Sequence, residues 1–279
     1  MADPALSVVL GLTPALLWGV VDILAKRVVA RTSVPATLVV LNAISLVPLI
    51  ILALPTSLAV ANQDLPFVAL LCSANLAGGV FLYLAFQKGK LSVVSPIAAT
   101  YPILSVLLAV AFLGEVVGPI RYAGMGVAVV GVYLLARGED NGATRAIAGL
   151  VPALGAVVGF GVAFYLFKPA VLIMGIYWSL VVTRLFTVGL LLPFGVKDAL
   201  TLDRRTVVFL AAMGLLDAGA YVAYNYGVTL GDLSIVAPLS GLFFAFTVVL
   251  ARLTLHERLK TIQWLGVAVI VAGVVLITR

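Results

Sequence analysis

Three ionisable residues, Asp22, Arg184 and Asp217, lie inside long apolar stretches of the sequence. A charged side chain is costly in lipid, so such residues normally face a partner, the protein interior or a water-filled cavity. Arg184 lies 10 residues before Phe194 and Asp217 lies 11 residues after Thr206. On consecutive antiparallel helices the two would share a depth, which predicts an ion pair between Arg184 and Asp217.

Two other roles stay open for the carboxylates. If Asp217 is not held in a structural pair, Asp217 or Asp22 could act as a proton-coupling group inside the membrane. Asp22 could instead lie at the membrane interface, paired with Lys26 four residues further along the same helix.

A polar face runs along the stretch from Asp217 to Asn225. Asp217, Tyr221, Tyr224 and Asn225 fall at positions i, i+4, i+7 and i+8, which share one side of a helix. A similar face precedes it in the chain and carries Asn75, Gly79, Tyr83 and Phe86. These two faces could line one cavity, or they could pack helices together through hydroxyl and amide hydrogen bonds.

The residue types that metal, nucleophilic or nucleotide chemistry needs are scarce. The chain has one His and one Cys, and it contains neither an H-E-x-x-H sequence nor a phosphate-binding glycine loop. We therefore expect no enzyme activity, no metal and no cofactor.

The composition is typical of a protein embedded in lipid. Hydrophobic residues make up 63% of the 279 residues and charged residues only 10%, and the mean hydropathy is +1.24. Soluble domains carry about 25% charged residues. The net charge of +6 comes from basic residues between apolar segments, so it indicates membrane topology rather than nucleic-acid binding.

Ten apolar stretches approach or reach the roughly 20 residues that a helix needs to cross a bilayer. The sequence therefore predicts an all-α membrane protein with ten transmembrane helices. The longest polar link, Arg137–Arg145, divides the chain into a first half, residues 1–138, and a second half, residues 139–279. The ten stretches are residues 6–25, 35–54, 66–86, 93–113, 120–136, 147–167, 174–194, 206–228, 233–253 and 262–278.

The two halves resemble each other. Residues 91–134 align without a gap to residues 233–276, 142 positions later, and 16 of the 44 positions are identical. The identities include the pairs Ser92/Ser234, Pro96/Pro238 and Glu115/Glu257. A five-helix half has an odd number of crossings, so its copy must be inverted in the membrane. Inverted repeats around a central cavity are typical of secondary transporters, although a duplicated scaffold without transport remains an alternative.

The Lys and Arg residues are distributed unevenly between the links. Links after the odd-numbered helices hold 13 of the 17 Lys and Arg residues, whereas the opposite side holds three. Because basic links stay in the cytoplasm, both chain termini are predicted to lie outside.

Several repeated residues stand at expected helix starts. Pro96 and Pro238 are expected to begin the fourth and ninth helices, where a missing N–H costs least, with Ser92, Ser95 and Ser234 able to bond the loosened backbone. Such starts could present a positive dipole end to a carboxylate, or merely initiate a helix. Glu115 and Glu257 are expected to complement the dipoles of the helices that follow them. The glycine pairs 124/131 and 266/273 predict close packing of the fifth and tenth helices, as scaffold or as a dimer face.

The doubled pattern of Ser-x-x-x-Pro, a long apolar helix, Glu and a glycine-spaced helix resembles the EamA repeat of the drug/metabolite transporter superfamily. Trp18-Gly19 is similar to the W-G opening of that repeat. Size and aromatic content are closest to amino-acid exporters of the YddG type. The resemblance implies ten helices around a central cavity that opens alternately to each side and moves a small metabolite outward. The second copy departs from the pattern at Ala237 and His256, which stand where the first has Ser95 and Gly114.

Together these observations predict a ten-helix exporter in the inner membrane of a prokaryote, either a monomer or a weak homodimer, with lipid and a small-molecule substrate as its partners. A small amphipathic zwitterion, such as an aromatic or aliphatic amino acid, fits an aromatic cavity with few fixed charges. Efflux of cationic drugs is an alternative, as is a membrane scaffold or receptor that transports nothing. The residues expected at the cavity are Trp18, Asn75, Tyr83, Tyr101, Phe160, Tyr221, Tyr224, Asn225 and Ser240.

Overall fold

The computed structural model describes residues 4–58, 60–137, 142–257 and 259–277, and these residues contain helices and no strands. Helices are the expected solution in lipid, because every backbone N–H and C=O must find a partner within the chain. The centre of the polar link between the halves, residues 138–141, lies outside the described residues. The elements in order are α1 (Pro4–Val29), α2 (Val34–Ala53), η1 (Asn62–Asp64), α3 (Leu65–Lys88), α4 (Leu91–Ala98), α5 (Tyr101–Leu108), the π-helical turn η2 (Ala109–Leu113), α6 (Pro119–Arg137), α7 (Gly142–Met174), α8 (Ile176–Leu200), α9 (Arg204–Leu230), α10 (Leu233–Gly241), α11 (Phe243–Thr254) and α12 (Thr261–Ile277).

Eight of the ten expected apolar segments are long apolar helices in the structure, and the fifth and tenth are shorter ones. Within the described part of the chain, eight helical stretches are long and apolar enough to cross a membrane. The helices α6 and α12 contribute shorter apolar stretches, Pro119–Leu134 and Thr261–Ile277. The chain is therefore a multi-pass membrane protein.

Two of the expected helices are broken near their middle, and here the sequence-based prediction was wrong. Pro96 and Pro238 do not begin helices: α4 and α10 begin at Leu91 and Leu233, and each proline lies several residues inside. A proline inside a helix removes one backbone hydrogen bond and crowds the preceding turn. Each short helix accordingly ends a few residues after its proline, and a new helix, α5 or α11, begins after the break.

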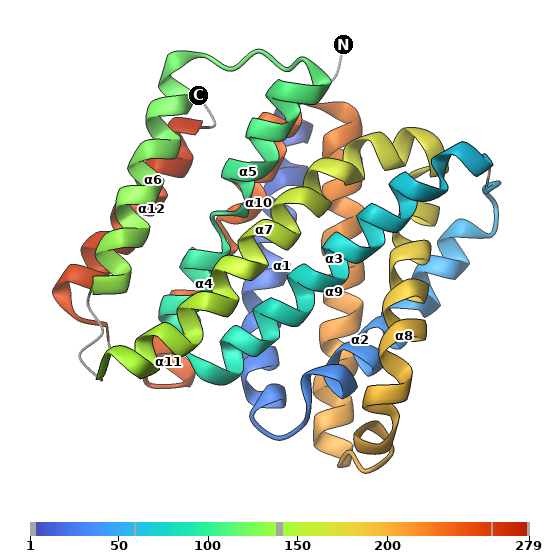
Figure 1. Cartoon of the computed structure of the whole chain (residues 1–279), viewed down its shortest axis with the longest axis horizontal. Coiled ribbons are helices and arrows are strands. Elements are labelled where there is room, and N and C mark those ends of the chain that lie inside the picture. Colours follow the sequence, from blue (N-terminus) through green and yellow to red (C-terminus); the bar gives the residue numbers. More distant parts are fainter. Residues whose placement is uncertain (1–3, 59, 138–141, 258, 278–279) are drawn as a thin grey trace.

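The main helix contacts join the two halves of the chain. α1 packs against α9, α3 against α7, α2 against α8 and α6 against α12 (Figure 1). Adding 142 to residue numbers converts α1 into α7 and α3 into α9, so the first two contacts are equivalent to each other. The broken helices follow the same rule, because α4 contacts α11 and α5 contacts α10.

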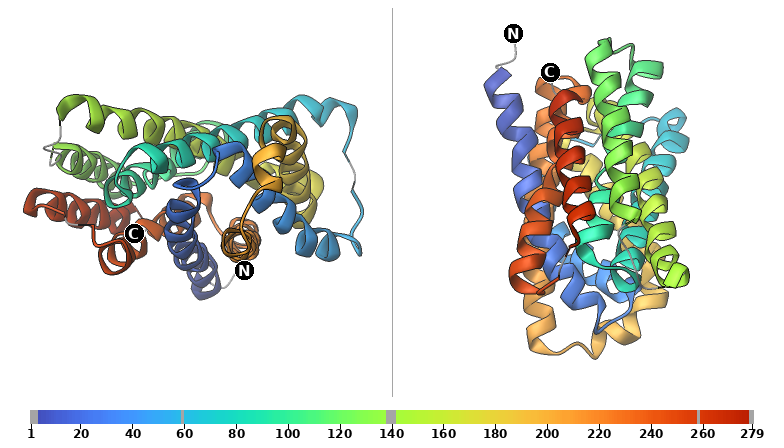
Figure 2. Two further views of the ribbon diagram at one scale, coloured as in Figure 1. Left: turned by 90° about the horizontal axis from the view of Figure 1, so that it is seen from below. Right: turned by 90° about the vertical axis from the view of Figure 1, so that its left-hand side faces the viewer.

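The pair α6 and α12 stands at one edge of the molecule (Figure 1 and Figure 2). Their contact is very close: a Cβ on Gly124 would lie 2.7 Å from the carbonyl oxygen of Gly273, and one on Gly131 would lie 2.7 Å from the backbone nitrogen of Ile270. The expected glycine-mediated packing of these helices is therefore confirmed. α1 begins and α12 ends at the same end of the molecule (Figure 1).

Gly114 and His256, which occupy equivalent positions in the two halves, share an uncommon backbone conformation. Their φ angles are 70° and 56°, both in the left-handed region. Glycine adopts this conformation without strain, and histidine is one of the side chains that tolerate it better than most. The change from Gly to His therefore leaves the turn intact, and in each half it places a glutamate directly afterwards.

Candidate functional site: a central cavity

A cavity of about 80 Å³ lies at the centre of the molecule, between helices of both halves. It is lined by residues of α1, α2, α3, α4 and α5 of the first half and of α7, α8, α9 and α11 of the second. Six of the nine cavity residues expected from the sequence line it, and so do all three intramembrane ionisable residues. These are Trp18, Asn75, Tyr83, Tyr101, Phe160 and Tyr221, together with Asp22, Arg184 and Asp217.

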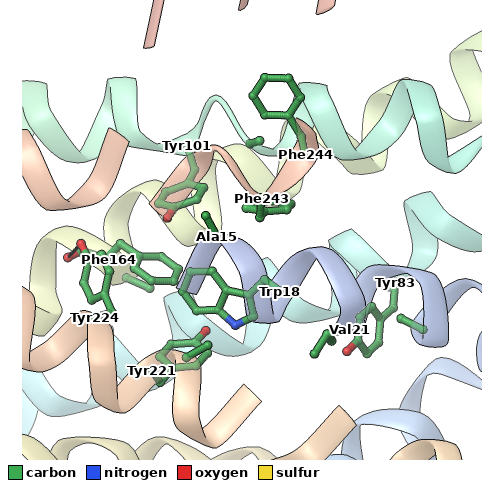
Figure 3. Close-up of a cluster of buried hydrophobic side chains, with 14 of the residues drawn as sticks. Ala15, Trp18, Val21, Tyr83, Tyr101, Phe164, Tyr221, Tyr224, Phe243 and Phe244 are labelled. Atoms are coloured by element: carbon green, nitrogen blue, oxygen red, sulfur yellow. Dashed lines mark hydrogen bonds between the residues drawn. The ribbon is translucent and has the colours of Figure 1, made fainter. Parts of the chain in front are cut away.

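Aromatic rings form one wall of the cavity (Figure 3). The ring of Trp18 meets those of Phe164 and Tyr221 edge-on, with centroid distances of 5.4 and 5.2 Å. Phe164 stacks on Tyr221 at 5.5 Å with an interplanar angle of 18°, and Phe243 approaches Trp18 at 6.3 Å. Phe164 and Phe243 were not expected at the cavity, because the sequence does not distinguish a phenylalanine that faces lipid from one that faces the protein interior.

Arg184 and Asp217 form the ion pair that their shared depth predicts, with 2.7 Å between Nη2 and Oδ2. The other carboxylate oxygen of Asp217 accepts a hydrogen bond from the indole Nε1 of Trp18 at 3.1 Å. Arg184 is only 2% exposed, and its guanidinium lies 4.2 Å above the ring centroid of Tyr221. Its Nε also donates a long hydrogen bond, of 3.4 Å, to Ser45. The positive charge of Arg184 is thus surrounded by groups that stabilise it.

Asp22 is buried at the junction of α1 with the two broken helices. Its Oδ2 accepts hydrogen bonds from Ser95 at 2.6 Å and from Thr247 at 2.9 Å, and the residue is 3% exposed. The alternative pairing of Asp22 with Lys26 is therefore wrong. The ammonium group of Lys26 instead donates to the backbone carbonyl oxygens of Phe86 and Gly89 at the end of α3.

Three residues expected at the cavity do not line it in this structure. Tyr224 donates a hydrogen bond to the carbonyl oxygen of Phe164 at 3.1 Å, and Asn225 donates to the backbone of Ile176 and to Ser179. Ser240 bonds the hydroxyl of Tyr101 at 2.6 Å. Their polar groups hold neighbouring helices together, and Tyr101 is the cavity residue that Ser240 positions.

Asn75 and Tyr221, from the two faces that the sequence singled out, meet across the cavity. The hydroxyl of Tyr221 donates to the amide oxygen of Asn75 at 2.9 Å. Tyr83, on the same helix as Asn75, lines the same cavity as Asp22, Asp217 and Arg184. The polar faces of α3 and α9 therefore do point at one another and at the three ionisable residues.

Glu115 and Glu257 cap the broken helices of the opposite half. The two carboxylate oxygens of Glu115 accept hydrogen bonds from the backbone N–H groups of Leu233 and Ser234, both at 3.0 Å. Those of Glu257 accept from the N–H groups of Leu91 and Ser92, at 3.0 and 2.8 Å. The expectation that each glutamate serves the helix following it in the chain was wrong, because the fold brings the start of a different helix closer.

Lys168 completes the environment of Glu115, with 2.8 Å between its Nζ and Oε1. Burial opposes ionisation of Glu115, but the bonds from Lys168 and from the start of α10 outweigh it and hold the pKa of this carboxyl below its usual value. Arg121 lies nearby and donates to the hydroxyl of Ser234 at 2.9 Å. Each glutamate thus ties one half of the chain to the helix start of the other.

No group of three His, Cys, Asp or Glu residues in the described part of the chain is arranged to hold a metal ion. What the central arrangement offers is a small chamber with an aromatic wall, one neutralised ion pair and one carboxylate without a basic partner among the described residues. Such a chamber can bind a small molecule by charge and by apolar contact.

Comparison with known proteins gives a consistent result. The probable amino-acid metabolite efflux pump of Escherichia coli (strain K12) is 27% identical over 242 residues, which cover 80% of each chain. An uncharacterised transporter encoded in the cobO 3′ region of Sinorhizobium sp. is 41% identical over 73 residues, so the match spans 26% of this chain and 52% of that relative.

A solved structure, described only as a crystal structure of a protein, has a TM-score of 0.74 over 98% of this chain and 96% of its own. At 18% identity this likeness shows the fold alone. The sequence model of the EamA-like transporter family matches the chain twice, over residues 5–137 and 147–279. Because these two matches cover nearly the whole sequence, the chain belongs to the EamA-like transporter family.

Proposed function

We propose that the protein is a secondary transporter that exports small metabolites, namely aromatic or aliphatic amino acids, by alternating access. In this proposal ten membrane crossings form two inverted units, residues 1–138 and 139–279, around the central cavity. The observation that carries it is the cavity itself, which lies between the halves and holds buried charged side chains. The broken helices add support, because interrupted helices around a central site are typical of transporters.

The chemistry of the cavity favours an amphipathic substrate. Trp18, Phe164 and Tyr221 offer apolar and aromatic surface, while Asp22 and Arg184 offer opposite charges. The E. coli relative is named as a probable amino-acid metabolite efflux pump, which agrees with an amino acid as substrate. Phosphorylated substrates would need several inward-facing basic residues, and Arg184 is the single arginine or lysine among the residues that line the cavity.

Efflux of organic cations is the second candidate, and Asp22 is the observation that favours it. This carboxylate borders the cavity and has no basic partner among the described residues. If cations are the substrates, Asp22→Asn abolishes their transport. A scaffold or receptor that transports nothing is the third candidate, and it predicts no flux of any compound.

The proposed orientation follows the basic links. The links after the odd-numbered crossings hold 13 of the 17 Lys and Arg residues, among them Lys26 and Arg27 at the end of α1 and Arg204 and Arg205 at the start of α9. The proposal therefore places these links in the cytoplasm and both termini outside. An inner-membrane protein, either a monomer or a weak homodimer, is the corresponding cellular form. The edge pair α6 and α12 is the candidate dimer face.

Counterflow into proteoliposomes tests the proposal. Purified protein is reconstituted with an unlabelled amino acid inside, and uptake of the labelled form is measured for a panel of amino acids and for the cation ethidium. We expect uptake of aromatic or aliphatic amino acids, reduced by Phe164→Ala and unchanged by Phe194→Ala, since Phe164 lines the cavity whereas Phe194 is 72% exposed. Uptake of ethidium alone supports the second candidate, and no uptake of any compound supports the third.

A further inference from the structure

Asp22 presents one oxygen to the cavity that the protein does not use. Its two hydrogen bonds, from Ser95 and Thr247, both end on Oδ2. Oδ1 accepts none from the described residues, although Asp22 is 3% exposed and lines the cavity. Asp22 Oδ1 is not among the fully buried unpartnered side-chain atoms of the described residues, so it keeps accessible surface, and a cationic group in the cavity would give it a hydrogen-bond partner.

Arg184 has spare donors in the same chamber. Its bonds to Asp217 and Ser45 use Nη2 and Nε, so Nη1 donates to neither, while the guanidinium as a whole stacks 4.2 Å above the ring centroid of Tyr221. Arg184 lines the same cavity as Asp22 and Tyr83. The chamber therefore holds an acceptor and a donor of opposite charge near one aromatic side chain.

We propose, on the basis of the transport function above, that the cavity recognises the two charged ends of a zwitterionic amino acid separately. Asp22 Oδ1 accepts a hydrogen bond from the substrate ammonium group, and Arg184 Nη1 donates to the substrate carboxylate. The substrate side chain then lies against Trp18, Phe164 and Tyr221, which border the same space (Figure 3).

The charges in the chamber set an order of preference among ligands. Arg184 and Asp217 neutralise each other, so Asp22 supplies the remaining negative charge. A carboxylic acid without an ammonium group would face two carboxylates and one arginine, which makes it the weakest ligand. An amine without a carboxylate would satisfy Asp22 but would leave Nη1 of Arg184 desolvated and unpaired. A zwitterion satisfies both groups and binds most tightly.

The size of the cavity fits the charged end of the ligand. A space of about 80 Å³ holds several water molecules, which an ammonium and a carboxylate group can replace. A side chain as large as that of leucine or phenylalanine requires the rings of the aromatic wall to separate. Recognition of the charged end is therefore the part of binding that this conformation already provides.

The test measures binding of phenylalanine to the purified full-length protein, beside phenethylamine, which lacks the carboxylate, and 3-phenylpropionate, which lacks the ammonium group. Leucine, 3-methylbutylamine and 4-methylpentanoate form a second series. We expect each amino acid to bind about 10- to 100-fold more tightly than either analogue, the range for losing one hydrogen bond to a charged group. An amine that binds as tightly as its amino acid overturns the inference.

Asp22→Asn then tests the assignment of the ammonium site. The variant keeps the shape of the side chain and loses its charge, so the preference for phenylalanine over 3-phenylpropionate should fall to about one. Asp232→Asn, at an exposed aspartate before α10, should leave that preference unchanged. An unchanged preference in Asp22→Asn overturns the inference. If Asp22→Asn fails to fold, the two ligand series on the unmodified protein still decide the question.

The outcomes separate this inference from the proposed function. Transport of amino acids with an unchanged ligand preference in Asp22→Asn overturns the inference alone and leaves the exporter intact. Failure of the unmodified protein to bind or transport any amino acid in the panel overturns both.

Discussion

The buried ion pair between Arg184 and Asp217 provides a quantitative test of the central architecture. Arg184→Met removes the guanidinium and leaves the Asp217 carboxylate with the indole N–H of Trp18 as its remaining hydrogen-bond donor in the described residues. Removing one partner of a buried pair typically costs about 3–5 kcal/mol, because an uncompensated charge remains. The bond from Trp18 is retained, so we expect the lower end of this range, about 3 kcal/mol.

Asp217→Asn should cost a similar amount, because it leaves Arg184 charged and buried with Ser45 as its other hydrogen-bond partner. The double variant removes both charges and leaves neither unpaired. Its cost should therefore be smaller than the sum of the two single costs, with a coupling free energy of at least about 2 kcal/mol. This non-additivity is the signature of a buried pair.

The measurement is the unfolding free energy of the four proteins in detergent micelles, obtained from denaturant titrations followed by circular dichroism. Arg205→Met, at an exposed arginine, is the matched control and should change stability by less than about 0.5 kcal/mol. If the two single costs add up to the double cost within about 0.5 kcal/mol, the pair carries no coupling and the reasoning is refuted.

Three further predictions concern a helix-capping carboxylate, a turn and a helix contact outside the cavity. Because the pKa of Glu115 is lowered in the folded protein, its bonds stabilise the fold fully above pH 4.5, the ordinary pKa, and this stabilisation is lost as the pH falls through the lowered pKa. The difference in melting temperature between the unmodified protein and Glu115→Gln should therefore be large at pH 7 and should shrink below about pH 4.5. A difference that does not depend on pH would contradict this prediction. Gly114→Ala should lower the unfolding free energy by about 1 kcal/mol, because alanine is strained in the left-handed conformation of Gly114; denaturant unfolding measures this. Gly118→Ala is the control and should lower it less, since a Cβ at either position meets no atom within 4 Å. Equal losses of stability would contradict the strain argument. Gly124→Ala places a Cβ 2.7 Å from a backbone oxygen of α12, so it should lower the unfolding free energy by about 1–3 kcal/mol. Gly126→Ala on the same helix is the control, because its Cβ meets open space. Similar melting temperatures for the two variants would show that the close contact is absent.

Periodicity and the internal repeat were sufficient to predict the helical segments. A stretch of apolar residues long enough for a membrane folds as a helix whatever its neighbours do, so this part of the prediction depends on local properties. The breaks in the fourth and ninth segments were missed because the apolar stretch is continuous through them. Pro96 and Pro238 were visible, but a proline does not by itself say whether a helix begins before or after it.

The site was predicted where the sequence contrasts with its surroundings. Asp22, Arg184 and Asp217 stand out in apolar stretches, and the cost of a charge in lipid places them inside the protein. Phe164 and Phe243 carry no such contrast, so their positions at the cavity depend on packing that the sequence does not display.

The roles of the glutamates depend on tertiary structure. Glu115 and Glu257 were expected to interact with the N-terminal ends of the helices that follow them, because a sequence shows only which residues are neighbours along the chain. In the folded protein each caps a helix start of the other half, more than a hundred residues away in the sequence.

The most direct test of the central claim is whether the cavity opens to both sides of the membrane. A single cysteine replaces Leu76, which lines the cavity, in a chain whose native Cys72 is changed to Ala. Sealed vesicles of known orientation are treated with a membrane-impermeant maleimide from one side or the other. A separate variant, with its single cysteine in place of the exposed Thr201, is the control for sidedness and should react from one side only. We expect the cysteine at position 76 to react from either side, and an excess of a transported amino acid to slow both reactions. Reaction from a single side under every condition, or from neither, would contradict alternating access through this cavity.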